Sequence, residues 1–161
     1  MRGILTCARG SACNDTGAAT ARRLSSLARP SNSPACKIAI VQMCSTSSVD
    51  ANTISCMKSI ETAAAIGAKM VFFPECFLYI SGGDAPVSQP KPLFTLDHPV
   101  LRQFRRAASA HSMWLSLGGF ALQHDGSDPR ARNAHALIAP DGGVAAVYNK
   151  IHLFDAQGAN S

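Results

Sequence analysis

The chain has 161 residues, enough for one domain with a buried core. It contains no run of eighteen apolar residues, so no membrane-spanning helix is expected. The formal charge of +5 is concentrated in residues 1–36, which hold five arginines and one aspartate, whereas residues 37–161 hold ten basic and nine acidic residues. Because the longer part is nearly neutral, a nucleic-acid groove is not expected there.

The six cysteines form no C-x-x-C pair and no regular framework. This pattern favours reduced thiols inside a cell over disulfides or a zinc site. No dense group of His and Cys offers metal-ligand spacing either, so we expect no metal.

Residues 1–36 are rich in Arg, Ala and Ser and nearly free of acids. That composition is typical of a mitochondrial or plastid transit peptide, with residues 1–9 as a short basic amphipathic turn. An N-terminal tail that is disordered and carries no address fits the same composition. We therefore divide the chain into a disordered leader, residues 1–36, and a folded part, residues 37–161, located in the mitochondrion or the cytoplasm.

The folded part opens with a strand–helix–strand pattern. Residues 37–43 are a β-branched apolar run, Asp50 can cap a helix that runs to about Ile66, and residues 69–73 form the next strand. Short connections make this a βαβ unit with parallel strands. The apolar positions expected to face the core from the helix are Ile54, Met57, Ile60, Ala64 and Ala65.

Glu75 follows the second of these strands directly. Residues 70–73 are continuously apolar and stop at Pro74, which predicts a strand buried on both faces. Glu75 then lies just past the carboxyl end of a strand, where open α/β folds place ligands. Taken alone, Glu75 is more often a solvated loop residue.

The second half alternates further elements with loops. The predicted elements are a loop at 79–97, a helix at 100–111, a strand at 113–117 ending at two glycines, a strand at 133–139, a hairpin turn at 140–143 and a returning strand at 144–148. Arg102, Arg105 and Arg106 are expected on a solvated helix surface. Lys150 follows the last strand, and by itself it reads as a surface lysine.

Several motifs resemble those of the nitrilase superfamily of carbon–nitrogen hydrolases, and most of all its deaminated-glutathione amidase branch. They are the Phe-Phe-Pro-Glu sequence at 72–75, Asn133 opening a strand, the Pro-Asp-Gly turn at 140–142 and the Tyr-Asn-Lys-Ile-His-Leu-Phe-Asp sequence at 148–155. The resemblance implies an α/β fold, here the N-terminal half of an α-β-β-α four-layer sandwich, and a Glu-Lys-Cys catalytic group. It implies that Glu75 is the general base, that Lys150 stabilises the tetrahedral intermediate, and that no cofactor takes part.

The family's nucleophilic cysteine lies downstream of the lysine motif, and this chain ends before it. Cys44 matches no family position, and the side chain of Cys76, next to Glu75, would point to the opposite face of an extended chain, so we expect no nucleophile in the chain and no amidase activity from the chain alone. Completed, the protein would take a small-molecule amide and could form homo-oligomers. The alternative function is a non-catalytic form that binds a full-length homologue or another partner through an uncovered sheet.

Overall fold

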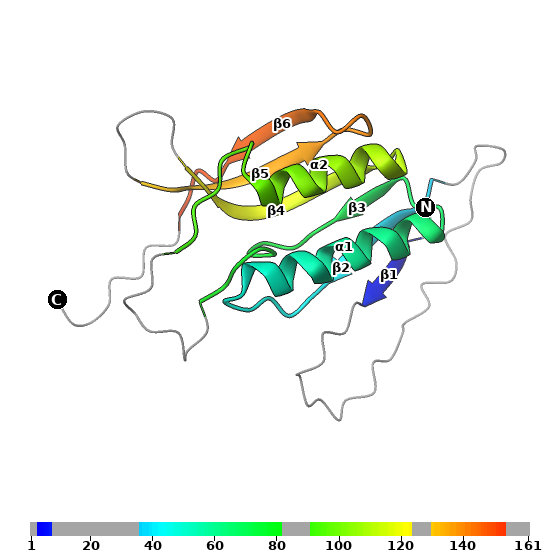
Figure 1. The fold of residues 1–161 in the computed structure, drawn as a ribbon, viewed down its shortest axis with the longest axis horizontal. Helices are drawn as coiled ribbons and strands as arrows, with labels where there is room; N and C mark the ends of the chain where they lie inside the picture. The colour runs from blue at the N-terminus through cyan, green and yellow to red at the C-terminus, as the bar shows by residue number, and fades with distance from the viewer. Residues whose placement is uncertain (1–2, 8–35, 82–90, 124–129, 154–161) are drawn as a thin grey trace, which may run out of the picture.

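The computed structural model describes residues 3–7, 36–81, 91–123 and 130–153. Figure 1 shows these residues as one twisted sheet with two helices beside it. Its elements are β1 (Gly3–Cys7), β2 (Ile38–Gln42), α1 (Val49–Ala65), β3 (Met70–Phe72), α2 (Pro99–His111), β4 (Trp114–Leu122), β5 (Arg132–Ile138) and β6 (Val144–Asn149). No helix within these ranges is long and apolar enough to cross a bilayer.

The six strands lie in chain order across a single sheet. Strands β1 to β4 are parallel, and β4, β5 and β6 are antiparallel. The predicted βαβ unit is confirmed, because β2 and β3 pair in parallel around α1. The predicted hairpin is also confirmed: Ala139 N donates to Gly143 O at 2.8 Å and Gly142 N to Ala139 O at 2.9 Å.

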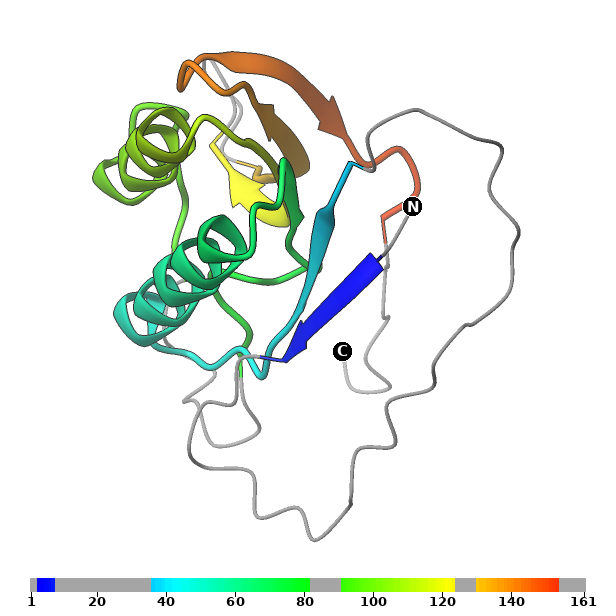
Figure 2. The ribbon, with the colours of Figure 1, turned by 90° about the vertical axis from the view of Figure 1, so that its right-hand side faces the viewer.

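Both helices cover the same face of the sheet (Figure 2), and the core lies between the helices and the sheet. Four phenylalanine rings join the layers, with centroids 5.5 to 6.2 Å apart and mostly edge-to-face. They are Phe73 and Phe77 from the segment after β3, Phe104 from α2 and Phe120 from β4. Edge-to-face packing adds to the stability from area burial, so this cluster fixes the segment that carries Glu75.

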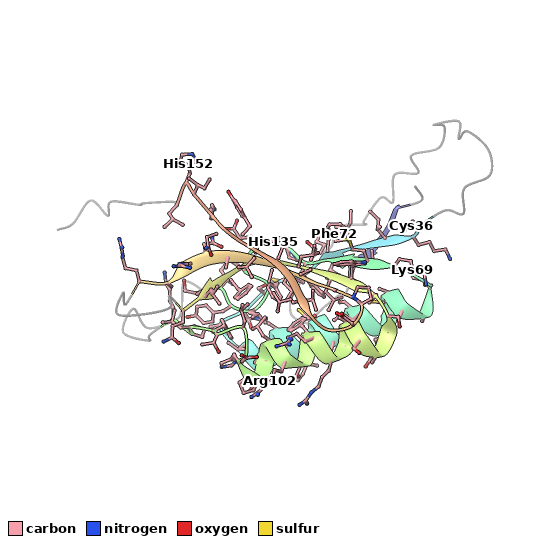
Figure 3. All side chains as sticks on the ribbon, turned by 90° about the horizontal axis from the view of Figure 1, so that it is seen from above. Cys36, Lys69, Phe72, Arg102, His135 and His152 are labelled. Atoms are coloured by element: carbon pink, nitrogen blue, oxygen red, sulfur yellow. The ribbon has the colours of Figure 1, made fainter. Side chains whose placement is uncertain are left out.

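The other face of the sheet is not covered by any described element. Ile40, Trp114 and Tyr148 are 46%, 37% and 57% exposed, and Phe72 lies on the same side in Figure 3. The prediction that residues 70–73 are buried on both faces is therefore wrong for the described structure. Only Val71 of β3 is fully buried, while Met70 and Phe72 are half-buried. The described residues thus form one helical layer and one sheet layer, an α/β arrangement.

The predicted core face of helix α1 is confirmed only in part: Ile60 is 1% exposed and Met57 and Ala64 pack against the core, but Ala65 is exposed. Ile54 is 70% exposed, whereas Asn52 is 3% exposed. The Asn52 amide donates to Thr46 O at 2.8 Å and Leu78 O at 2.9 Å, and it accepts from Thr46 N at 2.9 Å. Satisfying a buried amide in this way sets the rotation of the helix, and this outweighs the burial of one isoleucine. The helix begins after Ser48, which caps it, and not after Asp50.

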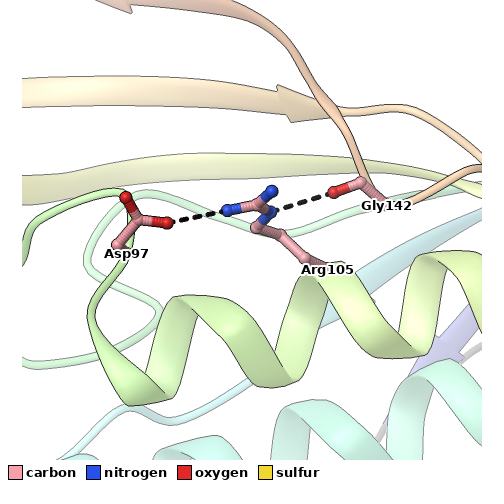
Figure 4. Close-up of polar contacts among 3 residues, drawn as sticks. All are labelled: Asp97, Arg105 and Gly142. Carbon is pink, nitrogen blue, oxygen red and sulfur yellow. Dashed lines mark hydrogen bonds and ion pairs between the residues drawn. The ribbon is translucent and has the colours of Figure 1, made fainter.

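Arg105 ties helix α2 to its neighbours and is not only a solvated surface residue. Its guanidinium donates to Gly142 O at 2.9 Å through Nε and to Asp97 Oδ1 at 3.0 Å through Nη1 (Figure 4). Gly142 has a φ of +84° and lies against α2, so a Cβ there would come within 2.7 Å of Arg105 O. The β5–β6 turn is therefore held to α2 by a contact that only glycine permits.

Residues 3–7 form a strand, which corrects the expectation of disorder and of an amphipathic turn for these five residues. All five pair with β2 in parallel. Without β1, the backbone groups along that edge of β2 would have no strand partner. Residues 8–35 lie outside the described residues, so the leader and its targeting role stay predictions.

Candidate active site

Glu75 lies in a segment whose backbone is hydrogen-bonded to β4. Phe73 N donates to Ser116 O at 2.9 Å, and Cys76 N donates to Gly119 O at 2.8 Å. Strand β4 continues through the two glycines to Leu122, whereas the sequence predicted that it would end there. The pairing with β5 shifts between Leu117 and Phe120, so the two glycines occupy an irregularity inside a longer strand.

The two glycines of β4 make room for this segment. A Cβ on Gly118 would lie 2.2 Å from Pro74 O, and a Cβ on Gly119 would lie 2.4 Å from Asn133 Oδ1 and 2.9 Å from Glu75 Cγ. No ordinary side chain fits at those distances. Glycine at both positions thus allows the close approach of Glu75 to the sheet without displacing Pro74 or Asn133.

Asn133 and Lys150 hold the Glu75 carboxylate from the neighbouring strands. Asn133 belongs to β5, Lys150 directly follows β6, and Lys150 N donates to Asn133 O at 2.8 Å. Glu75 Oε1 accepts from Asn133 Nδ2 at 2.8 Å and from Lys150 Nζ at 3.1 Å. Antiparallel pairing therefore aligns the amide and the ammonium on one carboxylate oxygen.

These partners lower the pKa of Glu75. The Asn133 amide contributes most and the Lys150 hydrogen bond next, while partial desolvation opposes them. Glu75 is therefore a carboxylate at neutral pH, able to accept a proton. The Glu75 and Lys150 side chains are 54% and 41% exposed, so their ion pair stabilises the fold by no more than about 1 kcal/mol.

The carboxylate lies at a cavity of about 540 Å³ on the face of the sheet away from the helices. It is lined by Phe73, Glu75, Gly118, Gly119, Asn133, His135, Tyr148 and Lys150. A second cavity of about 300 Å³ shares Gly119 and Asn133 with it and is lined chiefly by apolar side chains, among them Leu78, Phe94 and Phe120. The site thus combines a cavity that contains the carboxylate and its polar partners with an adjacent cavity that contains more apolar side chains.

None of the described cysteines lines the cavity of Glu75 and Lys150. Cys76 has a φ of 60° and lines the neighbouring cavity, and its pKa is raised by desolvation and by the Glu75 carboxylate. Burial raises the pKa of Cys56 to about 12. Cys36 and Cys44 are exposed. Within the described ranges, no three His, Cys, Asp or Glu residues form a group that could hold a metal ion.

The structure brings together the two residues that the sequence singled out, Glu75 and Lys150, and their catalytic role stays a prediction. Sequence analysis did not identify Asn133 as a site residue. The sequence could have identified Asn133, because it is a polar side chain at the start of a strand whose hairpin partner leads to Lys150. His152, which follows in the same motif, is exposed and does not line the cavity.

The model of the carbon–nitrogen hydrolase family matches residues 37–161. The nitrilase and fragile histidine triad fusion protein NitFhit of Drosophila melanogaster is 36% identical over 118 residues, which are 73% of this chain and 25% of that protein. The deaminated glutathione amidase of Dictyostelium discoideum is 31% identical over 122 residues, 74% of this chain and 42% of that protein.

Solved structures agree in fold. The crystal structure of the Caenorhabditis elegans NitFhit protein matches with a TM-score of 0.59 and 34% identity, covering 76% of this chain and 29% of that chain. That of an N-terminal amidase matches with a TM-score of 0.56 and 19% identity, covering 73% and 28%. The chain therefore spans between about a quarter and two fifths of the length of these relatives. With a family match over residues 37–161, the chain belongs to the carbon–nitrogen hydrolases of the nitrilase superfamily.

Proposed function

We propose that this protein contributes the base and the cation of an amidase that hydrolyses small-molecule amides of the deaminated glutathione type. One observation carries the proposal: a single Glu75 carboxylate oxygen is held between Asn133 and Lys150 at the edge of a cavity. The similarity to deaminated glutathione amidases supports the choice of substrate.

Each group is in the charge state that its proposed role needs, since the lowered pKa keeps Glu75 ionised at neutral pH. The Glu75 carboxylate takes the proton of a cysteine thiol, and the thiolate attacks the amide carbon. The Lys150 ammonium stabilises the oxyanion of the tetrahedral intermediate. The C–N bond then breaks, and Glu75 returns the proton to the leaving amine, which leaves a thioester. Water attacks the thioester with Glu75 again as base, and the carboxylic acid is released with the thiol restored.

The thiol must come from outside the described residues. Cys76, although next to Glu75 in sequence, lines the other cavity, and its raised pKa disfavours the thiolate. We therefore expect no measurable turnover that depends on Cys36, Cys44, Cys56 or Cys76, since none of them lines the Glu75 cavity.

The test compares this chain with the longest product of its transcript, with deaminated glutathione as substrate. We expect turnover only from a product that adds a cysteine at the Glu75 cavity. Glu75→Gln should then lower kcat about a hundredfold or more, since it removes the general base. Glu61→Gln is the matched control, because Glu61 is the chain's only other glutamate and is exposed on α1. Turnover that survives Glu75→Gln would refute the assignment.

The uncovered sheet face favours a second candidate, a non-catalytic role in which this chain binds a full-length homologue. The exposed apolar side chains of Ile40, Trp114 and Tyr148 lie on that face. Co-purification with a full-length homologue, lost in Ile40→Lys and kept in Ile54→Lys on the helical side, would support it. Equal capture by both variants would reject it.

A further inference from the structure

A second polar pair lies beside the Glu75 cavity, and one of its members, His135, lines that cavity. Ser116 Oγ on β4 is 3.0 Å from His135 Nε2 on β5. Ser116 is only 4% exposed, and His135 is half-buried and lines the same cavity as Glu75 and Lys150. Figure 3 shows His135 on the sheet face away from the helices. Neither residue has a part in the mechanism proposed above.

His135 lies two residues along β5 from Asn133, the residue that donates to Glu75. Asn133 and His135 are alternate residues of β5, so they share a face and lie about 7 Å apart. His135 pairs with Tyr148 across the hairpin, and Tyr148 lines the cavity as well. The cavity therefore has two polar rows, one with Asn133 and Lys150 and one with His135 and Tyr148.

The surroundings of Ser116 favour one form of the His135 ring. Among the described residues, His135 Nε2 is the only side-chain hydrogen-bond partner of the buried Ser116 hydroxyl. Since a buried hydroxyl proton needs an acceptor, the Ser116 hydroxyl would donate to Nε2, and the neutral ring would then carry its proton on Nδ1. No described residue accepts a hydrogen bond from Nδ1. The ring then has one donor left for a molecule in the cavity.

We propose that His135 binds substrate, donating its Nδ1–H to an oxygen of the acyl chain, and that Ser116 is the positioning residue that fixes its tautomer. This inference rests on the proposed function. The 7 Å between the rows suits an amide whose acyl chain carries an oxygen group, such as a carboxylate, two or three carbons from the scissile carbonyl. Amides with a purely apolar chain of the same length would lack this contact.

The tautomer is tested first, by long-range ¹H–¹⁵N spectra of the full chain labelled in its five histidines. The His135 signals are assigned from their loss in His135→Gln. We expect the Nδ1–H tautomer in the native chain, a mixture in Ser116→Ala, and no change in His111→Gln, whose residue is exposed on α2. An Nε2–H tautomer in the native chain would overturn the proposal.

Binding is tested with two probes that differ only at the distal group, succinamate and butyramide. We expect about tenfold tighter binding of succinamate to the native chain and to His111→Gln, as for one hydrogen bond to a charged group. His135→Phe should abolish the preference, and His135→Gln, which keeps a donor and is the safer variant for folding, should retain part of it. Equal or absent binding in the native chain, or a preference that survives His135→Phe, would overturn the proposal.

The two proposals fail in different ways. If the preference for succinamate depends on His135 but no completed product turns over deaminated glutathione, the binding site stands and the amidase assignment falls. If turnover depends on Glu75 but both probes bind equally, the reverse holds.

Discussion

Replacing Gly119 with alanine tests how the Glu75 site is assembled. The new Cβ would lie 2.4 Å from Asn133 Oδ1, whereas comfortable contacts begin near 3.5 Å. The Asn133 amide must therefore move by about 1 Å. A shift of that size lengthens the 2.8 Å bond from Asn133 Nδ2 to Glu75 beyond hydrogen-bonding range. Because this bond is the largest cause of the lowered pKa of Glu75, that pKa should rise in the variant. Its stability should fall by only about 1 kcal/mol, since the displaced atoms are side-chain ends.

Carboxyl ¹³C titration by NMR reads the pKa of Glu75 directly, and the two glutamates are told apart with Glu61→Gln. Gly67→Ala is the matched control. Gly67 has a φ of +74° and no atom within 4 Å of a Cβ, so alanine there costs about 1 kcal/mol in backbone strain far from the site. An unchanged pKa in Gly119→Ala, or an equal change in Gly67→Ala, would refute this account of the site.

The remaining contacts are tested by the free energy of unfolding in urea, measured for further variants and as a function of pH. Gly118→Ala should cost about 1–3 kcal/mol, more than Gly119→Ala, because its Cβ meets backbone 2.2 Å away; a smaller loss would contradict the close approach. Gly142→Ala combines a φ of +84° with a 2.7 Å contact to the α2 backbone, so it should lower the stability by at least about 1 kcal/mol. It should leave the pKa of Glu75 unchanged. Ile60→Ala should lower the stability by about 2–5 kcal/mol and Ile54→Ala by less than about 0.5. Similar losses in the two variants would mean that Ile54 is buried like Ile60, as the sequence predicted. Because the folded pKa of Glu75 is lowered, its stabilising contribution is present at neutral pH and is lost as pH falls through that folded pKa; Glu75→Gln should remove this dependence, which its exposure keeps below about 1 kcal/mol.

Sequence patterns predicted the elements whose physics is local. The β-branched run of β2, the Gly67 end of α1 and the Pro-Asp-Gly-Gly turn depend on neighbours in the chain, and each is found where it was expected. The face of α1 was predicted correctly at Ile60 but not at Ile54, because the Asn52 amide is held both by Thr46 O in the loop before the helix and by Leu78 O, 26 residues away. The continuation of β4 past its glycines was also missed, since it depends on pairing with β5.

By itself, the sequence determined that Glu75 and Lys150 each follow a strand, since apolar runs and their stops are written in consecutive residues. Only the tertiary structure decided that both meet one oxygen with Asn133, and that two glycines of β4 admit them. Strand register causes this difference: it aligns residues far apart in the chain through backbone hydrogen bonds that carry no local signature.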